Sequence, residues 1–410
     1  MKAFTLAGFV VLMSACSLGD KDCDSGASCD SGSPPDADAD SDTDADTDAD
    51  VDLIDDALLS FSVVVHPCVG NRTDALWVDD GGAYVGCGTT TSGTGLFTST
   101  SSGTEWAEVS GFEDFRVNNL WREEGGGPLY VSGNSTVGDG RVLSIGDTTE
   151  SVWDNGSTSE MSFSVGAFAR GSDGVAVAES LTGNGVVVQS SGTDWLSGYG
   201  WWGTAGHSAV QILDLDTAAG AVVGVGNVIS QPPTVYLPPR EWDFGAVMGA
   251  DGRADGLWEI VELSDDFGGE LWDIDGDTHG LAVGGVNQDD GHGVVWTIGS
   301  DWPSTAYSPS AWQYTDVRDV LGAVSPTWVR GVCRRGDRVA AVGEYSSLGD
   351  GFVLISQDGG DTFADRSGEV SDAMPAGMGL GPIHRCQFSS DGRLYAGGSD
   401  GIFVRHLPSE

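Results

Sequence analysis

The chain has 410 residues and a formal net charge of −44, with 62 acidic side chains against 18 basic ones. Fifteen acids lie between Asp20 and Asp56 and both lysines lie before residue 57, so residues 57–410 hold 47 acids against 16 arginines. A surface this acidic repels nucleic acid and anionic lipid, which excludes both as partners. The lack of lysine in residues 57–410 also excludes Schiff-base chemistry and lysine-dependent phosphate sites there.

Residues 1–15 predict a lipoprotein signal peptide. Lys2 precedes an apolar run that ends at residue 13, which is too short for a hydrocarbon core that needs roughly 20 residues. Residues 13–16 (MSAC) then resemble the lipobox of bacterial lipoproteins, in which cleavage leaves a lipidated cysteine at the new N-terminus. We expect lipidation of Cys16 and attachment to the cell envelope, and Ser17 favours the outer membrane. An ordinary secretory signal is the alternative.

Residues 16–56 predict a disordered tether. Large apolar side chains are almost absent before Leu53, and Asp36–Asp52 alternates aspartate with Ala, Ser, Thr or Val. Like charges repel along this segment and it has nothing to bury, so we expect it to be extended and solvated. Alternating aspartates also occur in calcium loops, but those loops need a glycine that residues 36–52 lack.

Residues 57–410 predict an all-β domain built from seven repeats. Each repeat holds a short strand of Ala, Tyr, Val and Gly, whose central residues are Val85, Val131, Val177, Val223, Val283, Val342 and Ala396. In six repeats an aromatic residue follows 18–22 residues later: Trp106, Trp153, Trp195, Trp242, Trp302 and Phe363. Repeats of about 40–50 residues with several short strands are typical of β-propeller blades. A β-sandwich is the alternative.

The seventh repeat ends soon after Ile402-Phe403-Val404 and lacks an outer strand. The segment Leu59–Val65, just before the first repeat, alternates enough to supply that strand. An open ring would leave a sheet edge exposed. We therefore predict a seven-bladed β-propeller that is closed by its N-terminal strand.

Six cysteines follow Cys16, and an even number in an exported chain predicts three disulfides. Sequence order favours Cys23–Cys29, Cys68–Cys87 and Cys333–Cys386 among the 15 connectivities that six cysteines allow.

Metal sites receive little support from the sequence. There is no CxxC motif, and the six histidines show no metal-ligand spacing. We therefore expect no cofactor and no bound metal, with calcium as the alternative. Asp273–Asp277 (DIDGD) has the oxygen-rich composition of a calcium loop. A hairpin turn between two strands is the favoured interpretation of this segment.

Residues 356–363 (SQDGGDTF) match the Asp-box pattern Ser-x-Asp-x-Gly-x-Thr-Trp, with Phe in the last place. In this pattern Ser356 and Asp358 bind backbone amides in the turn, Gly360 permits a positive φ, Thr362 follows, and Phe363 packs on the sheet. The chain therefore resembles the Asp-box (BNR) propellers, which include sialidases, sortilin-type receptors and photosystem II assembly-factor-like proteins. The resemblance implies a structural role for the Asp-box and implies little about function.

Catalysis of the sialidase type would need three converging arginines, a tyrosine activated by a glutamate, and an acidic proton donor. Phe115–Asn118 is nearest to the family's Phe-Arg-Ile-Pro signature and departs from it at the proline. Arg330 and Arg385 begin predicted inner strands and could face the channel, but they could also pair with acids. We expect no catalytic residues, with a degenerate sialidase-type glycoside hydrolase as the alternative.

The segment Gly198–Gly203 (GYGWWG) is the best candidate for ligand contact. Tyr199, Trp201 and Trp202 lie outside the repeated aromatic position, and exposed aromatics among glycines suit stacking on a sugar or a protein. Packing against a neighbouring blade is the alternative. The two long repeats also predict extra loops at about residues 229–256 and 303–326.

The leading hypothesis is a monomeric, surface-anchored, non-catalytic propeller that binds a protein or glycan at the cell envelope. A scaffold that assembles an envelope complex is a further alternative, which the assembly-factor resemblance implies.

Overall fold

In the computed structural model, residues 54–410 form one compact unit. The structure describes residues 59–408 except 66–67, 69–71, 80–81, 89–94, 101–104, 124–125, 136–139, 147, 155–163, 172–173, 181–184, 190–194, 200–209, 229–232, 238–258, 265–267, 323–324, 347–348 and 400–401. The predicted signal peptide, Cys16, the tether and the pair Cys23–Cys29 lie outside the described residues.

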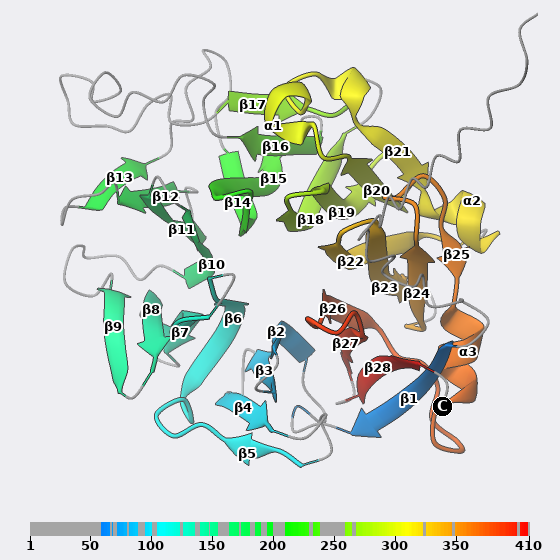
Figure 1. Cartoon of the computed structure of the whole chain (residues 1–410), viewed down its shortest axis with the longest axis horizontal. Coiled ribbons are helices and arrows are strands. Elements are labelled where there is room, and N and C mark those ends of the chain that lie inside the picture. The colour runs from blue at the N-terminus through cyan, green and yellow to red at the C-terminus, as the bar shows by residue number, and fades with distance from the viewer. Residues whose placement is uncertain are drawn as a thin grey trace, which may run out of the picture. The chain divides into compact units, whose positions relative to one another are not determined.

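The described strands form seven four-stranded antiparallel sheets, and the first strand of each lies nearest the centre in Figure 1. Sheet 1 contains β2 (Arg72–Asp79), β3 (Gly82–Gly88), β4 (Gly95–Ser99) and β5 (Ala107–Glu108), and sheet 2 contains β6 (Phe115–Trp121), β7 (Leu129–Ser135), β8 (Gly140–Ile145) and β9 (Thr149–Asp154). Sheet 3 contains β10 (Ser164–Gly171), β11 (Gly174–Ser180), β12 (Gly185–Gln189) and β13 (Trp195–Tyr199), and sheet 4 contains β14 (Val210–Ala218), β15 (Ala221–Val228), β16 (Pro233–Leu237) and β17 (Glu259–Glu262). Sheet 5 contains β18 (Gly269–Asp277), β19 (Gly280–Asn287), β20 (His292–Ile298) and β21 (Gln313–Asp316), and sheet 6 contains β22 (Thr327–Arg335), β23 (Arg338–Tyr345), β24 (Gly351–Ser356) and β25 (Ala364–Asp365).

The last sheet joins the two ends of the described chain. Sheet 7 contains β26 (Ile383–Phe388), β27 (Leu394–Gly398), β28 (Ile402–Pro408) and, as its outer strand, β1 (Leu59–Val65). Strand β1 pairs antiparallel with β28 along its whole length, and Figure 1 shows it beside the C-terminal strand. Phe61 and Val63 of β1 pack against a buried cluster that sheets 6 and 7 share.

The hydrophobic core lies between neighbouring sheets, as a propeller requires. Buried clusters join sheets 1 and 2, sheets 4 and 5, sheets 5 and 6, and sheets 6 and 7, and Tyr395 of sheet 7 packs into the cluster of sheet 1. Each central residue of the seven repeats lies in the second strand of a sheet. Six have described side chains and are at most 1% exposed: Val85, Val131, Val223, Val283, Val342 and Ala396. The predicted all-β propeller fold is confirmed.

The first strand of every sheet carries one β-bulge at the same place. The bulges lie at Asp74, Asn118, Gly166, Leu213, Trp272, Arg330 and His384. A bulge adds one residue to one strand of a pair, so the residues after it keep a common phase in all seven sheets. We count from the first residue after each bulge. The side chain two positions later reaches the following sheet, as Asp216 does, and the side chain three positions later reaches the preceding sheet, as Arg122 does.

Equivalent hydrogen bonds link three pairs of neighbouring first strands. In each pair a side-chain oxygen accepts a backbone N–H of the following sheet: Gly276 N donates to Asp216 Oδ2 (2.9 Å), Arg334 N to Asp275 Oδ2 (2.6 Å) and Val78 N to Gln387 Oε1 (2.6 Å). The third pair joins sheet 7 to sheet 1. Sheets 7 and 1 are therefore linked by a hydrogen bond equivalent to those that link sheet 4 to sheet 5 and sheet 5 to sheet 6.

Both disulfides within the described residues are those predicted from sequence order. Cys333–Cys386 joins β22 to β26, and Cys68–Cys87 joins the segment after β1 to β3. One bond therefore ties sheet 7 to sheet 6, and the other ties the end of its outer strand to sheet 1.

The prediction of a loop at residues 303–326 was wrong. This stretch contains most of α1 (Trp302–Thr305), the 3₁₀ helix η3 (Pro309–Ala311), β21 and α2 (Val317–Leu321). The helices α1 and η3 lie between β20 and β21, so the outer strand of sheet 5 begins later in the sequence than in most of the other repeats. The extra length of this repeat is therefore mostly helix and strand. In the other long repeat, β16 is the third strand of sheet 4.

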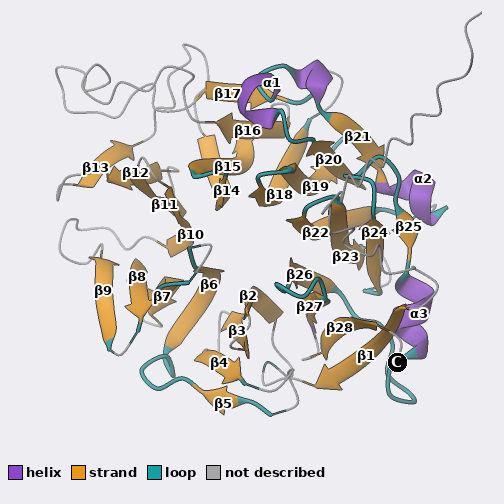
Figure 2. Cartoon of the chain, viewed as in Figure 1, coloured by secondary structure: helices purple, strands orange, loops and turns teal. Residues whose placement is uncertain are grey.

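The remaining helix, α3 (Ser367–Asp372), lies beside β1 and β28 in Figure 2, which colours helices, strands and loops separately. Among the residues that the structure describes, none of the helices is long and apolar enough to cross a membrane.

Candidate binding site in the central channel

Four side chains from separate sheets meet in the middle of the channel, and we call them the channel lock: Asn119, Asp214, Asp273 and Arg385. Arg385 Nη1 forms an ion pair with Asp273 and lies 3.9 Å from Asp214 Oδ2. Asn119 Nδ2 donates to Asp214 Oδ1 (3.2 Å). Both carboxylates are buried, at 4% and 6% exposure. The channel lock therefore connects sheets 2, 4, 5 and 7 across the axis.

The electrostatics of the channel lock depend on burial. Burial raises the pKa of Asp273 well above its usual range, although Arg385 opposes this, and the nearby Asp214 raises it further. Burial alone would lower the pKa of Arg385, but the neighbouring carboxylates outweigh it and the net shift is upward. These groups line a cavity of about 70 Å³, which has space for a few water molecules and little else.

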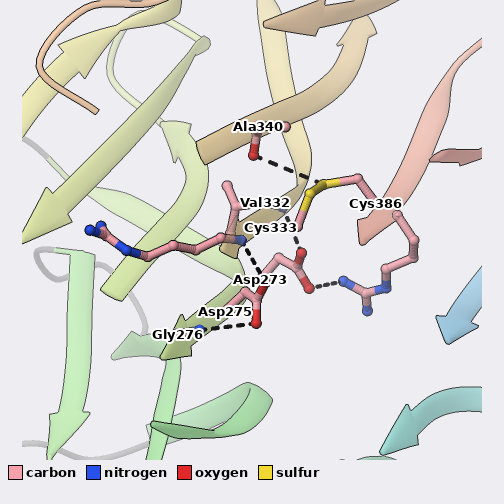
Figure 3. The surroundings of a disulfide bond; sticks show 9 residues. Asp273, Asp275, Gly276, Val332, Cys333, Ala340 and Cys386 are labelled. Carbon is pink, nitrogen blue, oxygen red and sulfur yellow. Dashed lines mark hydrogen bonds and ion pairs between the residues drawn. A yellow bond between two sulfur atoms is a disulfide. The ribbon is translucent and has the colours of Figure 1, made fainter. Parts of the chain in front are cut away.

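The segment Asp273–Asp277 lies in β18, so the prediction that it forms a hairpin turn was wrong. The carboxylates of Asp273, Asp275 and Asp277 alternate along one face of the strand. They accept backbone N–H groups of β22, at 2.7 Å from Val332 and 2.6 Å from Arg334, and of the turn after it, at 2.6 Å from Gly336. Figure 3 shows Asp273 and Asp275 among these partners, next to the disulfide of Cys333 and Cys386.

The sequence that resembled a calcium loop therefore bonds two sheets together. The described residues contain no group of three or more His, Cys, Asp or Glu side chains that could hold a metal ion. Burial raises the pKa of Asp275 to about 6, against the hydrogen bond from Arg334 N.

A larger cavity of about 930 Å³ opens at the end of the channel where the first strands finish. We call it the mouth cavity. Four of the 16 arginines of residues 57–410 line it: Arg122, Arg170, Arg334 and Arg335. Its other lining residues include two tryptophans and several acids, among them Trp77, Trp121, Asp79, Glu123 and Asp277.

Two of the four arginines are committed to structural contacts. Arg122 forms an ion pair with Asp79 of the preceding sheet. Arg334 is 1% exposed at its side chain and donates to backbone carbonyls of sheets 5 and 6, the shortest bond being 2.9 Å to His279 O. Burial lowers the pKa of Arg334 from its usual value, although nearby aspartates oppose this.

The other two arginines are exposed and bond to neutral oxygens. Arg170 Nη1 donates to the Tyr130 hydroxyl (3.1 Å), and Arg335 Nη2 donates to the Ser390 carbonyl (2.6 Å). Neither guanidinium forms an ion pair with any carboxylate of the described residues. The two strands that carry them, β10 and β22, lie on opposite sides of the centre in Figure 1.

Packed aromatic rings form part of the wall of the mouth cavity. Trp121 contacts Tyr130 and Phe168, which stack with centroids 4.7 Å apart. Trp77 is half-buried, and its indole Nε1 has no hydrogen-bond acceptor among the described residues. The Nε of Arg122 is likewise without an acceptor there. Both nitrogens are themselves buried in the wall of the cavity.

The arginines that sequence reasoning compared with a sialidase site are each paired with a carboxylate. Arg116 lies 3.4 Å from Asp74, and Arg330 lies 2.7 Å from Glu344. Arg330 also stands between the rings of Trp272 and Trp328, with its Cζ 4.4 and 4.6 Å from their centroids.

His384, at the bulge of β26, lies 2.6 Å from the hydroxyl of Ser399 through its Nε2. Burial lowers the pKa of His384 to about 3, with Arg72, Arg330 and Arg385 adding to the shift. This histidine is therefore neutral at physiological pH.

The Asp-box residues lie in the turn between β24 and β25. Ser356 Oγ accepts from Gly360 N (2.8 Å), and Asp358 Oδ1 accepts from Thr362 N (2.9 Å). Gly360 has φ +104, and a Cβ there would lie 2.4 Å from the side chain of Thr297 in sheet 5. Partial burial raises the pKa of Asp358, but hydrogen bonds from Thr362 and Ser356 outweigh it and lower the pKa. Phe363 packs against the cluster of sheets 5 and 6.

The structure leaves the aromatic candidates largely undescribed. Tyr199 is the last residue of β13, whereas Trp201 and Trp202 lie outside the described residues. Sequence reasoning missed the arginines of the mouth cavity. A signal was present, because Arg122, Arg170 and Arg334 precede the central residues of their repeats by 9, 7 and 8 residues.

Comparison with known proteins adds information at the level of the fold. No family model and no curated protein sequence matches the chain. The solved structure of YCF48 bound to D1 peptide is similar, with 16% identity, a TM-score of 0.54, and coverage of 85% of this chain and 94% of that one. YCF48 from Cyanidioschyzon merolae is 13% identical, with a TM-score of 0.54, and 85% and 99% of the two chains are covered.

An enzyme is also among the similar structures. The GH74 enzyme of Niastella koreensis is 14% identical with a TM-score of 0.52, over 83% of this chain and 53% of that one. Because these identities are low, the likeness shows the β-propeller fold and no more.

Proposed function

We propose that this chain is a lipid-anchored, non-catalytic β-propeller that binds a protein or glycan partner through the mouth cavity. The observation that carries the proposal is a cavity of about 930 Å³ whose mouth holds two exposed arginines without carboxylate partners among the described residues. Cavities of roughly 300–1,000 Å³ are typical of ligand sites. YCF48, a similar structure, was solved with a bound peptide, which supports a protein partner at a coarse level.

The contacts of the other arginines support binding without catalysis. A sialidase-type site needs guanidinium groups that converge on one substrate carboxylate. Arg116, Arg330 and Arg385 instead pair with three different carboxylates of the protein. A degenerate glycoside hydrolase is therefore the weaker candidate. An assembly scaffold at the envelope remains compatible with the same cavity.

We further propose that the seven sheets are the blades of one closed ring, with β1 as the closing strand. The pairing of β1 with β28 and the shared hydrogen bond between sheets 7 and 1 support this arrangement. A closed ring would hold Arg170 and Arg335 at a fixed separation, and rigid placement of binding groups favours affinity.

The anchor is tested by the variant Cys16→Ala. A lipidated cysteine is the attachment that the sequence provides, so the variant should leave the membrane fraction and appear in the soluble fraction. Immunoblots of fractionated cells measure this. A variant that stays with the membranes would disprove lipid anchoring at Cys16, and residues 1–15 and 16–56 would need another interpretation.

Partner binding is tested by capture from envelope extracts with the full chain. Wild-type protein should retain a partner that the double variant Arg170→Gln/Arg335→Gln loses. Arg318→Gln is the matched control, because Arg318 lies on α2 and pairs with Asp316 away from the mouth cavity. If the wild type and the double variant retain the same material, the mouth cavity is not the binding site.

A further inference from the structure

The mouth cavity brings together four arginines and five carboxylates, and two of these carboxylates, Asp79 and Asp277, pair with Arg122 and Arg334. Residues 57–410 hold 47 acids and 16 arginines, yet four arginines line this one cavity. Arg170 and Arg335 are exposed, and each donates to a neutral oxygen. A guanidinium has five donors, so both retain donors for an additional acceptor. The strongest such acceptor is a carboxylate or another anion.

The spacing of the two arginines calls for a ligand with more than one anionic group. Arg170 belongs to sheet 3 and Arg335 to sheet 6, and their strands face each other across the centre in Figure 1. One small anion cannot reach both sides of a cavity of this size. An oligomer with a carboxylate on successive units can.

The remaining lining favours a sugar over an acidic peptide. Glu123 and Asp277 lie in the same cavity and would repel closely spaced carboxylates. Sugar hydroxyls suit such a lining, because they donate to carboxylates and accept from guanidinium N–H groups, and sugar rings stack on tryptophan.

We propose that the mouth cavity binds an acidic oligosaccharide of the uronic acid class, with its carboxylates on Arg170 and Arg335. The inference rests on the proposed binding function and gives its ligand a chemical class. The net negative charge of the domain does not prevent this, because charges beyond about 8–10 Å are screened at physiological salt.

The test is calorimetric titration of the full chain with tetragalacturonate. The matched probe is its carboxyl-reduced form, the neutral tetragalactose, which keeps the chain length and the ring hydroxyls. We expect wild type to bind tetragalacturonate at least about tenfold more tightly than tetragalactose, because charge-assisted hydrogen bonds are roughly twice as strong as neutral ones. Arg170→Gln and Arg335→Gln should each weaken tetragalacturonate binding by about tenfold or more, and Arg318→Gln should leave it unchanged.

Other outcomes overturn the inference in distinguishable ways. Equal binding of both sugars, unaffected by the arginine variants, would retain a glycan partner and remove the acidic class. Binding of hexaglutamate in place of both sugars would assign the cavity to acidic peptides. Absence of binding by wild type to tetragalacturonate would also overturn the inference. In that case, capture of an envelope partner that the arginine double variant loses would still support the proposed function.

Discussion

Three arginines along the channel differ from Arg170 and Arg335 of the mouth cavity in the groups that they contact. Arg116, Arg330 and Arg385 each face a carboxylate of the protein, and the ion pair of Arg385 joins strands on separate sheets. Arg170 and Arg335 bond to a hydroxyl and a carbonyl and remain exposed. A buried charge needs a partner of opposite charge within the fold, whereas an exposed charge is solvated and is available to bind a ligand. In the proposed function, the first group stabilises the domain and the second recognises a partner.

The largest effect should come from deleting β1, the strand that we propose closes the ring. The deletion removes the backbone partners of β28 and the packing of Phe61 and Val63. Each lost contact costs about 1–3 kcal/mol, and several together approach the roughly 5–15 kcal/mol stability of a domain. A chain that lacks Leu59–Val65 should aggregate or melt far below wild type in thermal unfolding. A monomeric deletion variant of unchanged stability would mean that β1 does not close the ring.

The next effect should come from Arg385→Gln at the channel lock. Removing this guanidinium leaves Asp273 and Asp214 buried without their cation, which should cost about 2–4 kcal/mol in urea unfolding. The double variant Arg385→Gln/Asp273→Asn should recover part of the loss, because it also removes one uncompensated charge. Additive losses in the double variant would show that the two side chains do not interact.

A smaller effect should appear in the pH dependence of stability. Burial raises the pKa of Asp275 to about 6, and burial also raises those of Asp216 and Asp273. A carboxyl whose pKa is higher in the folded state contributes stability that is complete below its unfolded pKa and is lost as the pH rises through the folded pKa. The free energy of unfolding should therefore fall between about pH 4 and pH 6, by on the order of 1–3 kcal/mol from Asp275.

The variant Asp275→Asn is the control for this pH dependence. It keeps an oxygen for Arg334 N and cannot ionise, so its unfolding free energy should fall less than that of wild type over the same range. A wild-type profile that is flat, or that rises with pH, would show that Asp275 is ionised in the folded domain at acidic pH.

Much of the fold could be read from the sequence because it repeats. The seven strand centres, six of them with described and buried side chains, and the outer strand Leu59–Val65 follow from local patterns of apolar and glycine residues. The pairs Cys68–Cys87 and Cys333–Cys386 followed from order alone. The displaced strand of sheet 5 was missed, because short helices such as α1 have no periodicity long enough to recognise.

The binding site was much harder to predict. Arg122 and Arg335 are distant in sequence, and their shared cavity depends on the phase that one bulge per first strand imposes. A bulge is a single-residue change in register that no local composition marks. The aspartates at 273–277 were misplaced in a hairpin turn, because aspartates beside a glycine are typical of turns, whereas the segment lies in β18.

The most direct test of the contrast between the two groups of arginines is urea unfolding of Arg335→Gln beside Arg385→Gln. If Arg335 serves recognition, its variant should unfold within about 0.5 kcal/mol of wild type, as surface substitutions usually do, while Arg385→Gln loses several times more. Equal losses in the two variants, or a larger loss for Arg335→Gln, would contradict the account, because the mouth arginine would then be part of what holds the ring together.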